Sequence, residues 1–296
     1  MVLSRLGLHV SLRLVFPQPQ EQCVRIRSTF VLALAVPAQL LAQEPAGNQK
    51  APDWSVNVGA MAFVYPSYPG SDEYRVVPFP LADARYRDRV YLGPSSTGLG
   101  FALGAYPVQS SHWRLAVELG GQDSRGEDRA DALAGMEDLD FVVTGGVSLS
   151  YRTGPFEGIV AVSQGLNDDA GLIQTTRLVY YRPVGKVILG AAAGAALANG
   201  KQMRREFGIT EAEAARRQAL IDAGDGGLEA GDGQAYTPEG GLRHLGLGFT
   251  LIYPVASRWS LVGLAGVEWL ADEAANSPLV RQREQFAGGV GVGYRF

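Results

Sequence analysis

Two histidines follow residue 42 of this 296-residue sequence, and their imidazoles are the side chains best suited to acid–base chemistry near neutral pH. His112 stands beside Trp113 at the start of an alternating segment, where a histidine needs no catalytic role. His244 is predicted to face inward near the end of another such segment, with serines and aspartates on neighbouring loops. Catalysis would require a nucleophile within hydrogen-bond reach of that imidazole, and the spacing identifies none. We expect a polar lining residue at position 244 and no enzyme.

Charged side chains recur at alternate positions, opposite rows of apolar ones. Between residues 113 and 120, for example, Arg114 and Glu118 alternate with Trp113, Val117 and Leu119. A face of mixed sign suits either a selective pore or an interior closed by ion pairs, in which a half-satisfied charge would be costly. We expect a narrow or plugged interior. Its candidate lining residues are Arg114, Glu118, Asp140, Arg152, Arg177 and Glu268.

Acidic residues concentrate between the alternating segments, as at Asp72-Glu73, Glu127-Asp128 and Asp272-Glu273. Clustered carboxylates could bind Ca²⁺ or Mg²⁺, but no spacing corresponds to a calcium-binding loop. Solvated loop charge is the simpler interpretation, so we expect no metal and no cofactor. The formal net charge of −4 argues against nucleic acid as a partner.

The last eleven residues, FAGGVGVGYRF, define the elements that must position these side chains. Phe286, Val290, Val292, Tyr294 and Phe296 fall on one face of a strand, and glycines fill much of the other. A chain that finishes on an alternating strand with a terminal aromatic is typical of a bacterial outer-membrane barrel, whose outward row meets lipid. The final strand of a soluble sandwich is the alternative. We expect Tyr294 and Phe296 to form the signal for the barrel-assembly machinery.

Alternating segments of about ten residues continue back to Trp54, the length that a tilted membrane-spanning strand requires. Trp259 and Trp269 bound one of them, a separation of about 25 Å along the membrane normal. The sequence therefore predicts an all-β, antiparallel transmembrane barrel of about twelve strands, with ten or fourteen also possible. The predicted strands are 53–65, 74–86, 89–93, 98–106, 112–122, 138–152, 155–165, 171–182, 185–198, 242–253, 258–270 and 284–296.

Connections after even-numbered strands are short and the longest follow odd-numbered ones, which places both termini in the periplasm. Within the long 199–241 connection, Thr210 and Glu213 form a capping-box pattern, so we expect one short helix in this extracellular loop.

Residues 24–42 predict a secretory signal, with Arg25 and Arg27 before an apolar core and cleavage after Ala42. The only cysteine, Cys23, precedes this segment. We therefore expect a presequence over 1–42, a linker over 43–52 and one barrel domain over 53–296, in the outer membrane of a Gram-negative cell.

Two separated motifs resemble the MipA/OmpV family of outer-membrane proteins. The first, YPSYPGSDEYR at 65–75, contains Tyr68, Gly70, Ser71, Asp72, Tyr74 and Arg75. The second, LADEAANSPLV at 270–280, contains Ser277 and Pro278, and the terminal Tyr294-Arg295-Phe296 also fits. The resemblance runs over about 53–296 and transfers no catalytic residue.

The resemblance implies a structural or scaffolding role that links the envelope to murein machinery, through a murein transglycosylase or synthase, in contact with outer-membrane lipid and lipopolysaccharide. Porin-like members imply the alternative of a narrow channel for small solutes. The short periplasmic turns offer a scaffold little surface, so both hypotheses stay open.

Overall fold

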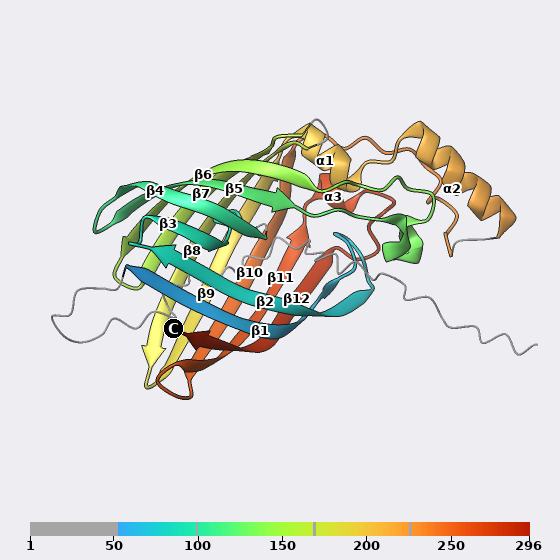
Figure 1. Ribbon diagram of the computed structural model, residues 1–296. Coiled ribbons are helices and arrows are strands. Elements are labelled where there is room, and N and C mark those ends of the chain that lie inside the picture. Colours follow the sequence, from blue (N-terminus) through green and yellow to red (C-terminus); the bar gives the residue numbers. More distant parts are fainter. Residues whose placement is uncertain (1–52, 99, 168–169, 225–226) are drawn as a thin grey trace, which may run out of the picture.

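The computed structural model of the protein describes residues 53–98, 100–167, 170–224 and 227–296, and within them twelve antiparallel strands close into a barrel (Figure 1). Every strand pairs with its neighbours in sequence, and β1 closes the barrel against β12. This confirms the predicted fold and strand number. The predicted signal segment and the 43–52 linker lie outside the described residues. The strands are β1 (Trp54–Pro66), β2 (Tyr74–Tyr86), β3 (Val90–Pro94), β4 (Phe101–Gln109), β5 (Trp113–Gln122), β6 (Val142–Thr153), β7 (Phe156–Gly165), β8 (Leu172–Val184), β9 (Val187–Ala198), β10 (Gly241–Pro254), β11 (Trp259–Leu270) and β12 (Glu284–Arg295).

The period-two pattern sorts side chains between lipid and lumen. Outward residues such as Val76 and Val290 are 71% and 70% exposed, whereas inward residues such as Glu118 and Thr175 are buried. A surface of exposed aliphatic side chains around polar inward ones is the reverse of a soluble core, and it fits a wall that faces hydrocarbon.

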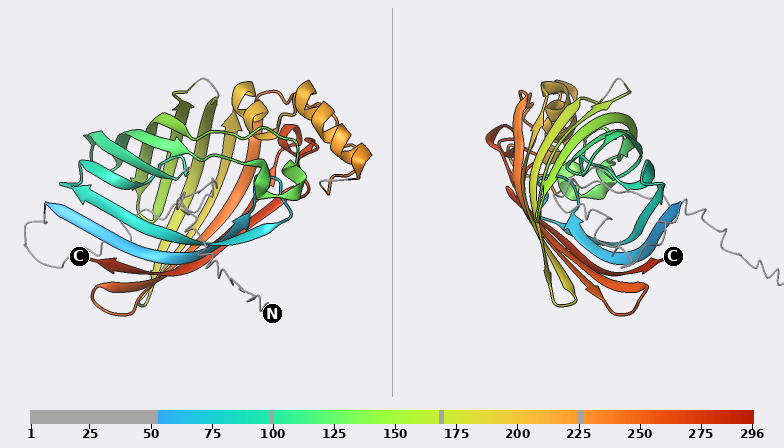
Figure 2. Two further views of the ribbon diagram at one scale, coloured as in Figure 1. Left: turned by 45° about the vertical axis from the view of Figure 1, so that its right-hand side comes forward. Right: turned by 90° about the vertical axis from the view of Figure 1, so that its left-hand side faces the viewer.

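Aromatic pairs encircle the end of the barrel at which the C-terminus lies. Ring centroids of Trp113 and Tyr151 are 4.6 Å apart, and those of Trp259 and Tyr294 are 4.9 Å apart. Tyr294 also packs at 4.9 Å against Phe296. Amphipathic rings at one level mark a membrane–water interface. This end also carries the short turns, so it is the periplasmic end (Figure 2).

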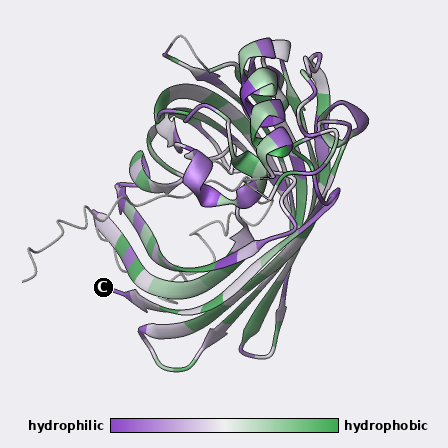
Figure 3. Ribbon diagram, turned by 90° about the vertical axis from the view of Figure 1, so that its right-hand side faces the viewer, coloured by the Kyte–Doolittle hydropathy of each residue, from purple (hydrophilic) through white to green (hydrophobic). Residues whose placement is uncertain are grey.

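The opposite end carries loops and helices in which hydrophilic and hydrophobic residues are interspersed (Figure 3). The 199–240 connection contains α1 (Gly200–Phe207) and α2 (Glu211–Ala223), and α3 (Asp272–Ala275) lies between β11 and β12. Two 3-10 helices, Glu127–Arg129 and Asp131–Leu133, lie between β5 and β6. None of the described helices is long and apolar enough to cross a membrane.

The single helix predicted after Thr210 is α2, and the capping box between Thr210 and Glu213 is present. The other helices were not predicted. Asn199 caps α1 by accepting a hydrogen bond from the Gln202 backbone N–H at 3.0 Å, a signal that a glycine at the next position weakens. Two strands were also misplaced, because β4 spans Phe101–Gln109 rather than 98–106 and β6 begins at Val142 rather than near 138.

Candidate functional site

The connection between β3 and β4 folds into the lumen, where its residues bind the carboxylate of Glu118 on β5. Ser95 Oγ donates to Glu118 Oε2 at 2.8 Å, and the Ser96 backbone N–H lies 3.0 Å from both oxygens of the same group. The Tyr91 hydroxyl donates to Glu118 Oε1. Four donors therefore hold one buried carboxylate once the Ser96 hydroxyl is included, and the loop is fixed across the barrel interior.

Two strands on the far side of the lumen complete this constriction. Ser148 Oγ on β6 donates to Ser96 Oγ at 2.9 Å, and the Arg177 guanidinium on β8 donates to the Ser96 carbonyl. The loop thus spans from β3 to β8, with a carboxylate on one side and a guanidinium on the other. This arrangement narrows the lumen.

Ion pairs line the periplasmic mouth below the constriction. Arg114 lies 3.3 Å from Asp88 and above the ring of Tyr106 at 4.7 Å, and Arg152 pairs with Glu157 at 2.6 Å. Opposite charges in contact lower the cost of keeping each charge inside a narrow barrel.

A second polar cluster lies in the extracellular half. Glu206 of α1 accepts from Arg243 Nε at 2.6 Å, and Arg243 contacts His244 Nδ1 at 2.6 Å. His244 Nε2 in turn lies 3.6 Å from Glu268 Oε1. His244 is therefore a buried polar residue that faces a guanidinium and a carboxylate. His112 is exposed at the β4–β5 turn and stacks on Tyr151.

Above that cluster, four extracellular connections pack into a cap with its own apolar core. Tyr68, Leu133, Ile209 and Leu279 are each at most 1% exposed, and they come from the β1–β2, β5–β6, β9–β10 and β11–β12 connections. We call this unit the cap; its buried core is Tyr68, Ala130, Ala132, Leu133, Met136, Ile209, Ala214 and Leu279. The cap lies over one side of the extracellular end of the barrel (Figure 3).

A buried arginine joins the two longest connections of the cap. Arg217 of α2 donates to the carbonyls of Ala132 and Ala134, both at 2.9 Å, and to that of Asp232 at 2.7 Å. The Asp232 carboxylate accepts from Arg281 at 2.7 Å. Burial disfavours the charged form of Asp232, but the hydrogen bonds from Arg281 and from the Glu229 N–H outweigh it and lower the pKa of this carboxyl. At Tyr68 burial is the dominant effect, and it raises the pKa of the hydroxyl to about 12.

The two family motifs are the parts of the cap that bind each other. The Tyr68 hydroxyl donates to the Leu279 carbonyl at 2.8 Å, and the Gly70 carbonyl accepts from Arg281 N at 2.7 Å. Ser277 Oγ donates to the Phe207 carbonyl at 2.7 Å and so ties the second motif to α1. Gly70 has φ +96°, and a Cβ there would meet Val280 Cγ2 at 2.6 Å. These contacts give the motifs a structural role.

The remaining motif residues lie at the edges of the cap. Ser71 is buried, and its carbonyl accepts from Gln285 Nε2 at 3.3 Å. Tyr74 OH accepts from the Phe286 N–H at 3.3 Å, and the Pro278 carbonyl is 3.5 Å from Arg281. Asp72 is exposed. Arg75 stands on the inward row at the extracellular end of β2.

The structure places five of the six predicted lumen residues, Arg114, Glu118, Arg152, Arg177 and Glu268, on inward rows of the strands. Asp140 is the exception, because it precedes β6 and its carbonyl accepts from Arg205 of α1. Sequence reasoning missed the loop serines at 95 and 96 and the buried Arg217, whose roles depend on long-range contacts. Period-two alternation would place Arg243 outward, next to the inward His244, and only the register shift in β10 buries both side chains, so no local signal could have indicated it.

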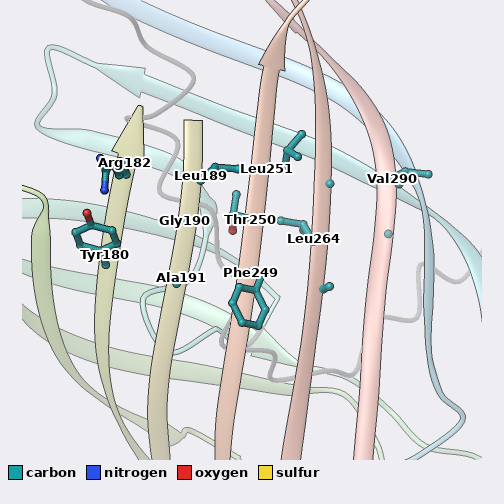
Figure 4. Close-up of a pocket in the computed structure, with 13 residues that line it drawn as sticks. Tyr180, Arg182, Leu189, Gly190, Ala191, Phe249, Thr250, Leu251, Leu264 and Val290 are labelled. Atoms are coloured by element: carbon teal, nitrogen blue, oxygen red, sulfur yellow. The ribbon is translucent and has the colours of Figure 1, made fainter. Parts of the chain in front are cut away.

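No three His, Cys, Asp or Glu side chains within the described ranges converge as metal ligands would. Hollows also lie in the wall of the barrel. One of about 530 Å³ forms where the small residues Ala191 and Gly263 leave space between Tyr180 and Phe249 (Figure 4). Most of the side chains around it belong to the outward, lipid-facing rows, so the hollow opens toward the bilayer.

A family model described as MltA-interacting protein MipA matches residues 58–296. The chain belongs to the MipA family. It is also 24% identical over 174 residues to the outer membrane protein Omp26La of Vibrio anguillarum, a match that covers 57% of this chain and 60% of that protein. With the lipid-facing barrel, this places the MipA-family chain in the outer membrane.

Solved outer-membrane barrels are similar to this MipA-family chain at low identity. An anion-selective porin from Comamonas acidovorans is 10% identical with a TM-score of 0.37, covering 82% of this chain and 98% of that one. The N-terminal barrel domain of Pseudomonas aeruginosa OprF is 13% identical with a TM-score of 0.25, covering 64% and 100%.

Proposed function

We propose that this MipA-family barrel is a non-enzymatic scaffold that holds a murein-processing protein at the periplasmic face of the outer membrane. The observation that carries this proposal is the restriction of the lumen at two levels. The loop at Ser95 and Ser96 crosses the interior, and the cap lies over one side of the extracellular end. A barrel that is narrowed inside and capped at its extracellular end is better suited to present a surface than to pass a solute.

The surface available to a periplasmic partner is basic. Exposed cations at this end are Arg87, Arg89, Lys186 and Arg258 on the turns and Arg182 near the end of β8, and the exposed acids near them are Asp53 and Asp88. We call the five cations the basic rim. Complementary charge speeds encounter and sets orientation even where little area is buried, so short turns suffice for a partner with an acidic surface. Because the family is named for an interaction with MltA, a murein transglycosylase or a synthase that acts with it is the partner class we propose.

The test is a crosslinking capture of murein enzymes by the full-length protein in its native membrane. Arg182→Gln/Lys186→Gln/Arg258→Gln should lower recovery of the transglycosylase severalfold at physiological salt. The matched control neutralises three exposed cations of the cap segment, Lys201, Arg204 and Arg216. Equal recovery from both triple variants, or no recovery of a murein enzyme from the unsubstituted protein, would refute the scaffold.

A narrow solute channel is the second candidate, and a separate observation favours it. Asn57 Nδ2, Thr175 Oγ1 and Arg177 Nε are buried inside the barrel and have no hydrogen-bond partner among the described residues. Buried polar groups need partners, and solute or water in the lumen would supply them. Single-channel recording in planar bilayers separates the two candidates: a folded but silent barrel supports the scaffold. Steady conductance that Glu118→Gln alters would make the channel the function.

A further inference from the structure

The barrel wall is incomplete beside the β3–β4 hairpin. β2 pairs with β1 along its whole length, but with β3 only through Ala84↔Leu92, Arg85↔Tyr91 and Tyr86↔Val90. From Tyr74 to Asp83, β2 has no strand on this side among the described residues. Figure 1 shows β3 ending short of the extracellular end of β2. At about 3.3 Å per residue, roughly 30 Å of strand edge is left unpaired.

The sequence of β2 suits an edge that stays unpaired in a membrane. Arg87 N donates toward β1, to Asp53 O, and Arg89 N donates to Tyr86 O on the β3 side. Because backbone groups of successive strand residues point to opposite sides, the even-numbered residues of β2 direct theirs toward the free edge. Pro78 and Pro80 are two of these and have no N–H. They remove two donors that hydrocarbon could not satisfy, and they prevent another strand from pairing there.

The interior behind this edge is apolar, unlike the rest of the lumen. Val77, Phe79 and Leu81 form the inward row of β2, and each remains partly exposed. The Phe79 ring stacks on Phe101 at 5.8 Å and lies 5.9 Å from Phe63. The facing strands β5 and β8 instead carry Glu118, Thr175 and Arg177. An accessible apolar wall inside a polar barrel is a surface that binds hydrocarbon.

A cation stands at the extracellular end of the same row. Arg75 lies on the inward face of β2, half-buried, and it has no hydrogen-bond or ion-pair partner among the residues that the structure describes. Six residues of strand, roughly 20 Å, separate it from Leu81. The other buried motif residues are occupied by contacts in the cap, whereas Arg75 is left to bind something else.

We propose that the open edge of β2 is a lateral binding site for one acyl chain of an anionic outer-membrane lipid. The chain enters from the bilayer past Phe101 and lies along Val77, Phe79 and Leu81, with its anionic headgroup at Arg75. The apolar row of β2 and Arg75 would both bind a ligand that is already in the bilayer. Such a ligand reaches the site through the unpaired edge of β2 and not along the barrel axis. The site does not depend on a murein partner.

Photocrosslinking of the full-length protein in vesicles of phosphatidylglycerol and phosphatidylethanolamine tests the site. A benzophenone amino acid replaces Phe79, whose ring faces the lumen, and mass spectrometry reads the lipid adduct. The same probe at Val76, 71% exposed on the outward face, is the positive control. At Thr175, buried on the inward row of β8, it should give no adduct. Heat-modifiable migration on gels shows that each variant is folded.

We expect adducts at positions 79 and 76, with phosphatidylglycerol enriched at position 79 only. Arg75→Gln should lower the phosphatidylglycerol adduct at position 79 roughly fivefold and leave the adduct at position 76 unchanged. No adduct at position 79 in a folded protein that reacts at position 76 would overturn the lateral site. Equal adducts at positions 79 and 175 would also overturn it, because lipid would then fill the lumen without selection. If Arg75→Gln leaves the amount of phosphatidylglycerol adduct at position 79 unchanged, Arg75 does not bind the headgroup and that part of the proposal is refuted.

Discussion

Replacing Arg217 with alanine tests whether the cap is held together by one buried guanidinium. The side chain is inaccessible to solvent and donates three hydrogen bonds, to carbonyls of two separate connections. Arg217→Ala leaves the carbonyls of Ala132, Ala134 and Asp232 without these donors inside the cap. The Asp232 carboxylate keeps Arg281, so no buried charge is left unpaired.

The structure sets the size of the effect. Removing one partner from a buried charged network costs 3–5 kcal/mol, and the lower end, about 3 kcal/mol, applies because Arg281 still neutralises Asp232. This corresponds to a shift of roughly 150-fold in the opening equilibrium of the cap. The twelve-strand ladder does not include Arg217, so the barrel itself should stay folded.

Native-state hydrogen exchange of α2 and of residues 130–136 measures the opening, with heat-modifiable migration reporting the barrel. Arg216→Ala is the matched control, since that neighbouring side chain is 46% exposed and bonds Glu137 at the surface. We expect the lost protection in Arg217→Ala only. If both variants exchange alike, or if Arg217→Ala unfolds the barrel together with the cap, the cap is not the separable unit described above.

Three further predictions concern the cap and the C-terminus. The pKa values of Asp232 and Glu213 are lowered in the folded protein, so their contribution to cap stability is present above about pH 4 and is lost as the pH falls through the folded-state pKa values. The protease susceptibility of the cap should therefore rise steeply in acid. A flat susceptibility profile from pH 7 to 3 would contradict this prediction. Gly70→Val adds a Cβ at φ +96° against Val280 and should destabilise the cap by about 2 kcal/mol, measured as faster proteolysis of loop 199–240. The control is Gly154→Val, which is also at positive φ but has no atom within 4 Å of the added Cβ, and it should leave the cap unchanged. Phe296→Ala removes a ring that is 72% exposed, so in vitro stability should change by under about 1 kcal/mol while the folded yield in cells falls; a normal yield in cells would end the assembly-signal prediction.

Much of the barrel could be predicted because period-two alternation is local. Trp259, Leu261 and Val267 identify the lipid face of β11 without knowledge of any partner strand, and the turn lengths then identify the periplasmic end. The same alternation placed Glu118 and Arg177 inward. It failed at Asp140, where the pattern continues into a segment that pairs with no neighbouring strand.

The contacts that join these residues could not be predicted, because they connect positions far apart in the chain. Ser96 meets Arg177 across 81 residues, and Tyr68 meets Leu279 across 211. The resemblance located the family motifs but not their mutual binding. The prolines of β2 were a local signal of an edge strand, and their meaning became evident only once β3 was seen to end early.

The sequence by itself determined the class of the protein: lipid-facing rows, membrane sidedness and family follow from residue order, since each depends on a repeat of two residues, on the lengths of the connections or on a short motif. The strand number was predicted as about twelve and fixed by the structure. Only the tertiary structure decided what the barrel does with its interior. The position of the β3–β4 loop in the lumen, the cap and the open edge of β2 all depend on contacts between segments distant in sequence. Packing and hydrogen bonds between those segments fix them.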